Sequence, residues 1–251
     1  MPTVALLALH GFGGTGADFE PVVQATSPSH LQWATPDLPA HGSFQISRSE
    51  LPNLSFSLTD AFVTEAFSRL AADQRWLLGY SMGGRIALHA VCSGSVKPDR
   101  LILIGASPGL ECPRERASRL DLEEAWATRV EREGMARFAE FWTTLPIIQS
   151  QEAIPEPTRS LIQRRRAEQN PANIAQVLRS LGTGRMPSLW PALARITCPT
   201  DLFTGARDGK FARIAQRMLP HLIKGRHMEI SHAGHTAHLE NPTEFAHHLM
   251  Q

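Results

Sequence analysis

Short apolar runs alternate along this chain with longer segments whose apolar residues recur at helical spacing. This alternation is typical of a parallel β-sheet with helices on both faces, because parallel neighbours need crossover connections. We expect strands at about 3–9, 31–36, 75–79, 100–105, 199–204 and 225–230. We expect helices near 16–24, 58–72, 82–93, 209–219 and 241–250. The pattern predicts an α/β fold with about six parallel strands.

Residues 108–190 interrupt this alternation, because they contain no convincing strand. Amphipathic helical stretches fill the block, at 113–132, 135–145, 157–169 and 171–181. It carries 12 Arg and no Lys against 11 Asp and Glu, so we expect most of its arginines on solvated helix faces. The block lies between two expected strands, and ligands bind at the carboxyl edge of such sheets. We therefore predict a helical cap, 108–190, over that edge of a core built from 1–107 and 191–251.

Charge and composition exclude several classes of partner. The chain has 25 Lys and Arg against 24 Asp and Glu, so no strong field favours nucleic acid or an anionic membrane. The longest apolar run, 4–9, is too short to span a bilayer and follows no basic segment, so we expect no secretory signal. The three cysteines show no C-x-x-C spacing, which favours a reducing cytoplasm. No obligate protein partner is evident.

The segment 79–84 reads GYSMGG and matches G-x-S-x-G. In that motif a serine lies on a tight turn between a strand and a helix, and its hydroxyl projects above the sheet. Ser81 has this context, since an apolar run precedes it and a helical pattern follows. Ser107 lies in a second match, 105–109, but Pro108 disfavours helical backbone there. We therefore predict Ser81 as the reactive serine and Ser107 as a residue at a strand end.

A reactive serine needs a base, and the base needs a carboxylate that orients it. The chain order in this type of fold is serine, acid, histidine. Asp208 and His235 follow the last two expected strands, so we predict a Ser81–His235–Asp208 triad. Asp208 has an alternative role as the N-cap of the next helix. His235 has one as a metal ligand with His232 and His238, although Gly234 argues for a loop and no H-E-x-x-H pattern is present.

A glycine-rich turn, HGFGG at 10–14, follows the first strand. Such a turn can direct backbone N–H groups at a developing negative charge. Together with the N–H after the nucleophile, it predicts an oxyanion hole formed by the amides of Phe12 and Met82. A dinucleotide-binding turn is the competing interpretation, but the required G-x-G-x-x-G is not matched. We expect no metal and no cofactor.

These motifs resemble the α/β-hydrolase superfamily and, more narrowly, the family of 2-succinyl-6-hydroxy-2,4-cyclohexadiene-1-carboxylate synthases of menaquinone and phylloquinone biosynthesis. The resemblance covers nearly the whole chain. It rests on LHGF (9–12), DLPAHG (37–42), GYSMGGR (79–85), SPGL (107–110), RASR (116–119), FAEFW (138–142), GARDGKF (205–211) and GHTAHLENP (234–242). Two residues depart from the family pattern: Ala40 replaces a glycine, and Thr236 replaces an asparagine.

The resemblance implies an α/β-hydrolase fold and a lyase that eliminates pyruvate from a cyclohexene with three carboxylates, 2-succinyl-5-enolpyruvyl-6-hydroxy-3-cyclohexene-1-carboxylate. Ser81 would remove the ring proton next to the succinyl ketone. The family motif further implies substrate contacts from Tyr80, Arg85, Arg119, Trp142 and Arg166. Arg166 lies in a run of three arginines and has a solvated helix face as its alternative, while Trp142 has packing between cap helices.

Two other functions stay open from the residues. A serine carboxylesterase or C–C bond hydrolase needs the same triad, but an apolar acyl pocket beside Arg85 and Arg119 is unfavourable. A non-catalytic binder would have no use for a triad in this order.

Overall fold

Six strands form one parallel sheet in the order β2-β1-β3-β4-β5-β6. The computed structural model describes residues 2–26, 31–44 and 46–251. The strands are β1 (Val4–Leu9), β2 (Leu31–Ala34), β3 (Gln74–Tyr80), β4 (Arg100–Ile104), β5 (Thr200–Gly205) and β6 (Gly225–Ile230). The prediction of about six parallel strands is confirmed.

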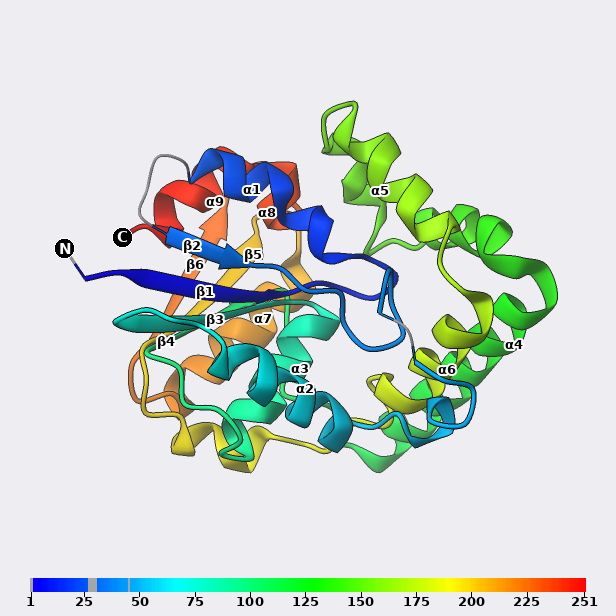
Figure 1. Cartoon of the computed structure of the whole chain (residues 1–251), viewed down its shortest axis with the longest axis horizontal. Helices are drawn as coiled ribbons and strands as arrows, with labels where there is room; N and C mark the ends of the chain where they lie inside the picture. The colour runs from blue at the N-terminus through cyan, green and yellow to red at the C-terminus, as the bar shows by residue number, and fades with distance from the viewer. Residues whose placement is uncertain (1, 27–30, 45) are drawn as a thin grey trace.

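Helices cover both faces of the sheet (Figure 1). One face carries α2 (Phe56–Ser68), α3 (Met82–Cys92) and α7 (Gly209–Met218), and the other carries α1 (Glu20–Ala25), α8 (Ala237–Glu240) and α9 (Pro242–Leu249). Successive strand side chains point to opposite faces, so each apolar strand supplies two cores. Leu7 and Leu9 pack in the first core, and Leu6 and Ala8 pack in the second.

Local capping explains where the helices differ from the expected ranges. The helix expected near 58–72 is α2, which begins at Phe56 because the Ser55 hydroxyl accepts the Leu58 N–H at 3.3 Å. The helix expected near 16–24 is divided into a 3₁₀ turn, η1 (Gly16–Phe19), and α1. Pro21 lies in the first turn of α1, where a missing N–H costs nothing.

The segment between β4 and β5 holds α4 (Pro113–Thr143), η3 (Gln149–Ala153), α5 (Thr158–Ala167), α6 (Pro171–Leu181) and η4 (Trp190–Arg195). The structure describes all of 108–190 and places no strand there. Leu189 donates its N–H to the Pro108 carbonyl at 2.7 Å, so the two ends of the segment lie together. The division at 107/108 and 190/191 stays a prediction.

The cap helices lie beside the sheet, at the ends of the strands away from the two chain termini (Figure 1). They have a core of their own, which includes Val130, Phe138, Trp142 and Ile174. Among the described residues, none of the helices is both long enough and apolar enough to cross a bilayer.

Helix α4 bends at Gly134, which has a φ of 78° and a ψ of 170°. This backbone region is accessible essentially to glycine alone. The bend lies between the two helical stretches expected at 113–132 and 135–145. Although a Cβ at Gly134 would meet nothing within 4 Å, we expect Gly134→Ala to lower the free energy of unfolding by about 1–3 kcal/mol. Urea denaturation measures the change.

Gly209→Ala is the matched control, because Gly209 lacks a positive φ and has room for a Cβ. An equal effect of both substitutions on the free energy of unfolding would contradict the conformational explanation.

Candidate active site

Ser81 lies on the turn between β3 and α3 with φ 51° and ψ −106°, a conformation that a non-glycine residue rarely adopts. The neighbouring glycines make the turn possible. A Cβ on Gly79 would lie 2.4 Å from the Gly83 carbonyl oxygen, and one on Gly83 would lie 2.1 Å from the Leu9 carbonyl oxygen. Glycine is therefore required at positions 79 and 83, because close backbone contacts leave no room for a side chain there.

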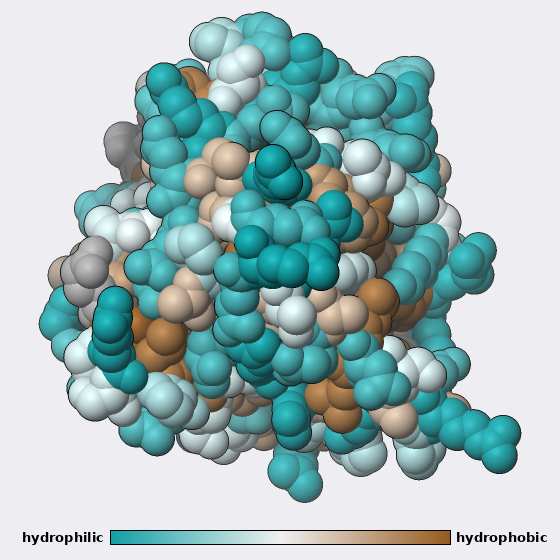
Figure 2. Space-filling view, turned by 90° about the vertical axis from the view of Figure 1, so that its right-hand side faces the viewer, coloured by the Kyte–Doolittle hydropathy of each residue, from teal (hydrophilic) through white to brown (hydrophobic). Residues whose placement is uncertain are grey.

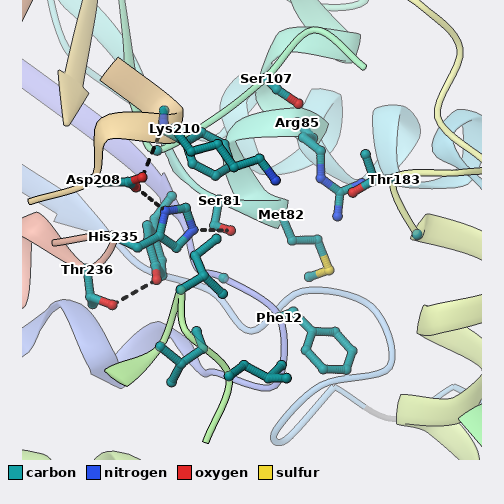
Figure 3. Close-up of a pocket in the computed structure, with 18 of the residues that line it drawn as sticks. Phe12, Ser81, Met82, Arg85, Ser107, Thr183, Asp208, Lys210, His235 and Thr236 are labelled. Atoms are coloured by element: carbon teal, nitrogen blue, oxygen red, sulfur yellow. Dashed lines mark hydrogen bonds and ion pairs between the residues drawn. The ribbon is translucent and has the colours of Figure 1, made fainter. Parts of the chain in front are cut away.

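Three distant side chains meet at the carboxyl edge of the sheet (Figure 3). The Ser81 hydroxyl lies 3.0 Å from His235 Nε2, and His235 Nδ1 lies 2.8 Å from Asp208 Oδ2. A carboxylate only accepts, so Nδ1 carries the proton and Nε2 is free to accept from the serine. Gly105 permits the approach, because a Cβ there would lie 2.7 Å from His235 Cε1.

Asp208 makes the contacts of both of its possible roles. Its Oδ2 accepts from His235, and its Oδ1 accepts the Phe211 N–H at 3.1 Å as the N-cap of α7. The helix thereby fixes the carboxylate that orients the imidazole. The Phe211 ring packs against His235 with the ring centroids 4.5 Å apart.

The two amides expected to form the oxyanion hole belong to residues that line the same cavity as Ser81. Met82 is the first residue of α3, where backbone N–H groups have no intrahelical acceptor. Phe12 lies in a four-residue turn that the Gly14 N–H closes on the Gly11 carbonyl at 3.1 Å. Their role as oxyanion donors stays a prediction.

Two buried histidines support the Phe12 turn, a role that the sequence analysis did not assign. His41 Nε2 accepts the Gly13 N–H at 3.2 Å, so its Nδ1 donates to the Pro39 carbonyl. His10 Nε2 accepts the Leu38 N–H at 2.9 Å, and its Nδ1 donates to Gly11. Burial lowers the pKa of His41 to about 3 and also lowers the pKa of His10. Ala40 beside them has φ 66°, which agrees with glycine being usual there.

A cavity of about 990 Å³ lies between the sheet edge and the cap, and Arg166 is its most unusual lining residue. Arg166 is only 4% exposed, and its Nε and Nη1 have no hydrogen-bond partner among the residues that the structure describes. Burial lowers the pKa of its guanidinium. A buried, unpaired cation is costly, so this side chain is suited to an anionic ligand rather than to a solvated helix face.

Arg85 and Arg119 line another part of the cavity. Arg85 donates to the Leu181 carbonyl at 2.7 Å, and burial lowers its pKa to about 10. Arg119 donates from Nε to Glu123 at 2.6 Å. Glu123 is 2% exposed and also accepts the N–H of Thr183 at 2.7 Å. One carboxylate thus faces two arginines, which leaves a net positive charge.

Tyr80 and Trp142, the remaining predicted contacts, also line the cavity. The Tyr80 hydroxyl lies 3.0 Å from Thr236 Oγ1, and burial raises the pKa of the phenol. Trp142 packs on Phe12 with the ring centroids 4.8 Å apart. Trp142 also belongs to the core of the cap, so it both lines the cavity and packs between cap helices.

Several residues of the site lay outside the sequence analysis. Lys210 was noted only as part of a motif, yet its side chain points into the pocket beside Ser81 (Figure 3). Glu123 and Gln169 belong to no motif. His238 is buried against Tyr80, whereas His232 is exposed. In the described part of the chain, no three or more His, Cys, Asp or Glu side chains are grouped to hold a metal ion.

The outer face of the cap side is largely hydrophilic, with its hydrophobic residues in separate patches (Figure 2). Scattered apolar residues of this kind are ordinary on a protein surface.

The chain is similar to known proteins in sequence and in fold. A family model described as "Alpha/beta hydrolase family" matches residues 6–248. The chain is 33% identical over 245 residues to the 2-succinyl-6-hydroxy-2,4-cyclohexadiene-1-carboxylate synthase of Photorhabdus laumondii, which covers 96% of this chain and 82% of the relative. It is 32% identical over 246 residues to the Pectobacterium atrosepticum enzyme of the same name, with coverages of 96% and 90%.

Solved structures show the same fold. MenH from S. aureus superposes with a TM-score of 0.88 at 32% identity, over 98% of this chain and 91% of that chain. A thermophilic esterase from Thermogutta terrifontis has a TM-score of 0.80 at 20% identity, over 100% and 90%, and shares the fold alone. The fold and the resemblance that the sequence predicted are confirmed.

The buried histidines predict a pH dependence of stability. Burial lowers the pKa of His41 and His238 to about 3 in the folded chain and also lowers the pKa of His10, whereas histidines protonate near pH 6.5 when the chain is unfolded. The unfolded state therefore binds more protons in acid. The contribution of these histidines to the free energy of unfolding is therefore fully present above about pH 6.5 and is lost as the pH drops below it. We expect His41→Gln to reduce this fall by up to about 1.4 kcal/mol per pH unit.

Urea denaturation between pH 5 and pH 7.5 checks this slope. His247→Gln removes an exposed histidine and should leave the slope unchanged. Identical slopes for His41→Gln and the unmodified chain would show that His41 is not held neutral.

Proposed function

The chain belongs to the alpha/beta hydrolase family and, within it, to the 2-succinyl-6-hydroxy-2,4-cyclohexadiene-1-carboxylate synthases, and we propose that it is a lyase of menaquinone or phylloquinone biosynthesis. Its reaction eliminates pyruvate from 2-succinyl-5-enolpyruvyl-6-hydroxy-3-cyclohexene-1-carboxylate. One observation carries the proposal: hydrogen-bonded Ser81, His235 and Asp208 line a cavity that also has cationic side chains at several separate positions.

Proton removal starts the reaction. The proton passes from the Ser81 hydroxyl to His235 Nε2, 3.0 Å away, and the Asp208 carboxylate stabilises the imidazolium that forms. The Ser81 oxygen then takes the ring proton next to the succinyl ketone. Electrons move into the ketone to form an enolate and then back through the ring, so that the bond from the ring carbon to the enolpyruvyl oxygen breaks and the diene forms. The enolate of pyruvate leaves and takes up the proton held by His235, which gives pyruvate and returns the imidazole to its neutral form.

Negative charge develops on the ketone oxygen during this step. The amides of Phe12 and Met82 are our assigned donors for it, in the arrangement that also serves acyl transfer. One such donor is worth about 2.7–4 kcal/mol of transition-state stabilisation.

The cations of the cavity suit the carboxylates of the substrate. Arg166, the Arg85–Arg119 pair and Lys210 line different parts of it. Guanidinium groups bind carboxylates with two parallel hydrogen bonds and keep their charge when buried. We assign Tyr80 and Trp142 to the walls. An esterase or C–C bond hydrolase of the same fold would have to place an apolar acyl chain beside these charges.

The remaining assignments follow the sequence. We place the reaction in the cytoplasm, since no cysteine of the described chain is in a disulfide. The proposed partner is the small polycarboxylate alone, with no nucleic acid, membrane or obligate protein. We treat 108–190 as the cap and the rest as the core.

The direct test is the appearance of the conjugated diene by absorbance from the enolpyruvyl substrate. We expect Ser81→Ala to lower kcat by about a thousandfold or more, because the base is lost while the binding groups stay. Rapid turnover of simple aryl esters without any diene signal would instead identify an esterase.

Arg166→Met separates binding from folding. Since the guanidinium is buried without a hydrogen-bond partner at Nε and Nη1, its removal should leave the free energy of unfolding unchanged or raise it by up to about 1–3 kcal/mol. We expect KM for the polycarboxylate to rise by at least about tenfold, the loss of one charge-assisted contact.

Arg179→Met is the comparison, because Arg179 pairs with Glu124 and Glu131 away from the cavity. It should leave KM unchanged. A destabilised Arg166→Met with normal KM would show that Arg166 is structural.

A further inference from the structure

Gln169 joins two loops of the core although it belongs to the cap segment. It lies between α5 and α6 and is 6% exposed. Its Oε1 accepts the Gly42 N–H at 2.9 Å, and its Nε2 donates to the Gly14 carbonyl at 3.3 Å. Both partners are backbone groups, so neither contact depends on the side chain of the core residue.

The Gly14 carbonyl belongs to the turn that presents the Phe12 amide. Gly14 closes this turn by donating its N–H to Gly11, and Gly13 has the positive φ of 68° that the third turn position needs. The core holds the turn through His10 and His41. Gln169 holds the end of the turn at Gly14, so Phe12 lies between the contacts from the core histidines and the contact from the cap.

The same stretch of the cap makes two more contacts with this loop. Arg165 donates to Asp18 at 3.1 Å, and the Asp18 carboxylate accepts the Thr15 N–H. The Arg166 side chain lies directly against Gly13, where an added Cβ would be 3.5 Å from Arg166 Cγ. Gln169 is also tied to Arg166, because its N–H donates to the Arg166 carbonyl at 3.4 Å.

We propose that Gln169 is a positioning residue that fixes the Phe12 amide for the oxyanion, so that the oxyanion hole is complete only with the cap in place. This inference rests on the proposed role of the Phe12 amide, but not on which substrate is used. The stabilisation that a donor gives depends on its distance from the developing charge, and a displacement of about 1 Å can cost a hundredfold in rate. Holding the turn by its carbonyl therefore acts on the transition state more than on substrate binding.

The test compares Gln169→Leu and Gln169→Glu with the control Gln163→Leu, an exposed glutamine on α5. Leucine removes both contacts. Glutamate keeps an oxygen for the Gly42 N–H but cannot donate to Gly14, so it isolates the contact with the turn and serves if the leucine variant does not fold. Both should lower kcat for pyruvate elimination by about ten- to a hundredfold and change KM by less than about threefold.

A second readout follows the oxyanion itself. A trifluoromethyl ketone with a carboxylate side chain adds to Ser81 and places a negative oxygen in the hole, whereas the diene product binds without one. Both Gln169 variants should weaken trifluoromethyl ketone binding by about ten- to a hundredfold and leave product binding unchanged. Gln163→Leu should match the unmodified protein in every measurement.

Three outcomes overturn the proposal: an unchanged kcat in folded variants, equal losses of product and ketone binding, or a lowered melting temperature as the only effect. If the unmodified protein binds the ketone but makes no diene, the proposed substrate is wrong. The ketone measurements then still decide the role of Gln169.

Discussion

The turn at Ser81 constrains everything that the active site can do. Its backbone passes so close to Leu9 and to the start of α3 that positions 79 and 83 admit no Cβ. The contact with Leu9 exists because β1 and β3 are neighbours in the sheet. The loop after β1, with Phe12, therefore lies against the first turn of α3, with Met82. Phe12 and Met82, from distant parts of the sequence, line the same cavity as Ser81 because two parallel strands end at the same edge.

Charge in the cavity is balanced differently from charge in the rest of the cap. Outside the cavity, several arginines of the cap form ion pairs, as Arg179 does with Glu124 and Glu131. Inside it, Arg166 has bare Nε and Nη1 groups, and Arg85 and Arg119 share Glu123. Such an arrangement costs folding free energy unless an anion completes it. His10 and His41 are neutral for a related reason. Only a neutral imidazole can accept a hydrogen bond, and these two rings accept the N–H groups of Leu38 and Gly13.

Sequence patterns located the parts of this protein that depend on local chemistry. The approximate positions of six parallel strands and of the main helices followed from periodicity, whereas the strand order did not. Ser81, Asp208 and His235 followed from turns at strand ends, where the structure brings them within hydrogen-bond distance. Arg166 was harder to place, since only burial distinguishes it from its neighbours in a run of three arginines. Gln169 and Glu123 could not be found at all, because an uncharged amide or a helical glutamate gains its role only from how the cap lies on the core.

A base and the proposed oxyanion hole do not by themselves choose between acyl transfer and elimination. The difference lies in which atom of the ligand is held at the Ser81 oxygen: a carbonyl carbon leads to acylation, and a C–H next to the carbonyl leads to an enolate. A rigid ring whose carboxylates are bound at fixed, separate cations has little freedom to rotate between these poses. Arg119 and Arg166 are cap residues, whereas the triad lies on loops of the core. In the proposed function, the cap therefore selects the reaction by orienting the substrate, and the core supplies chemistry that would serve either one.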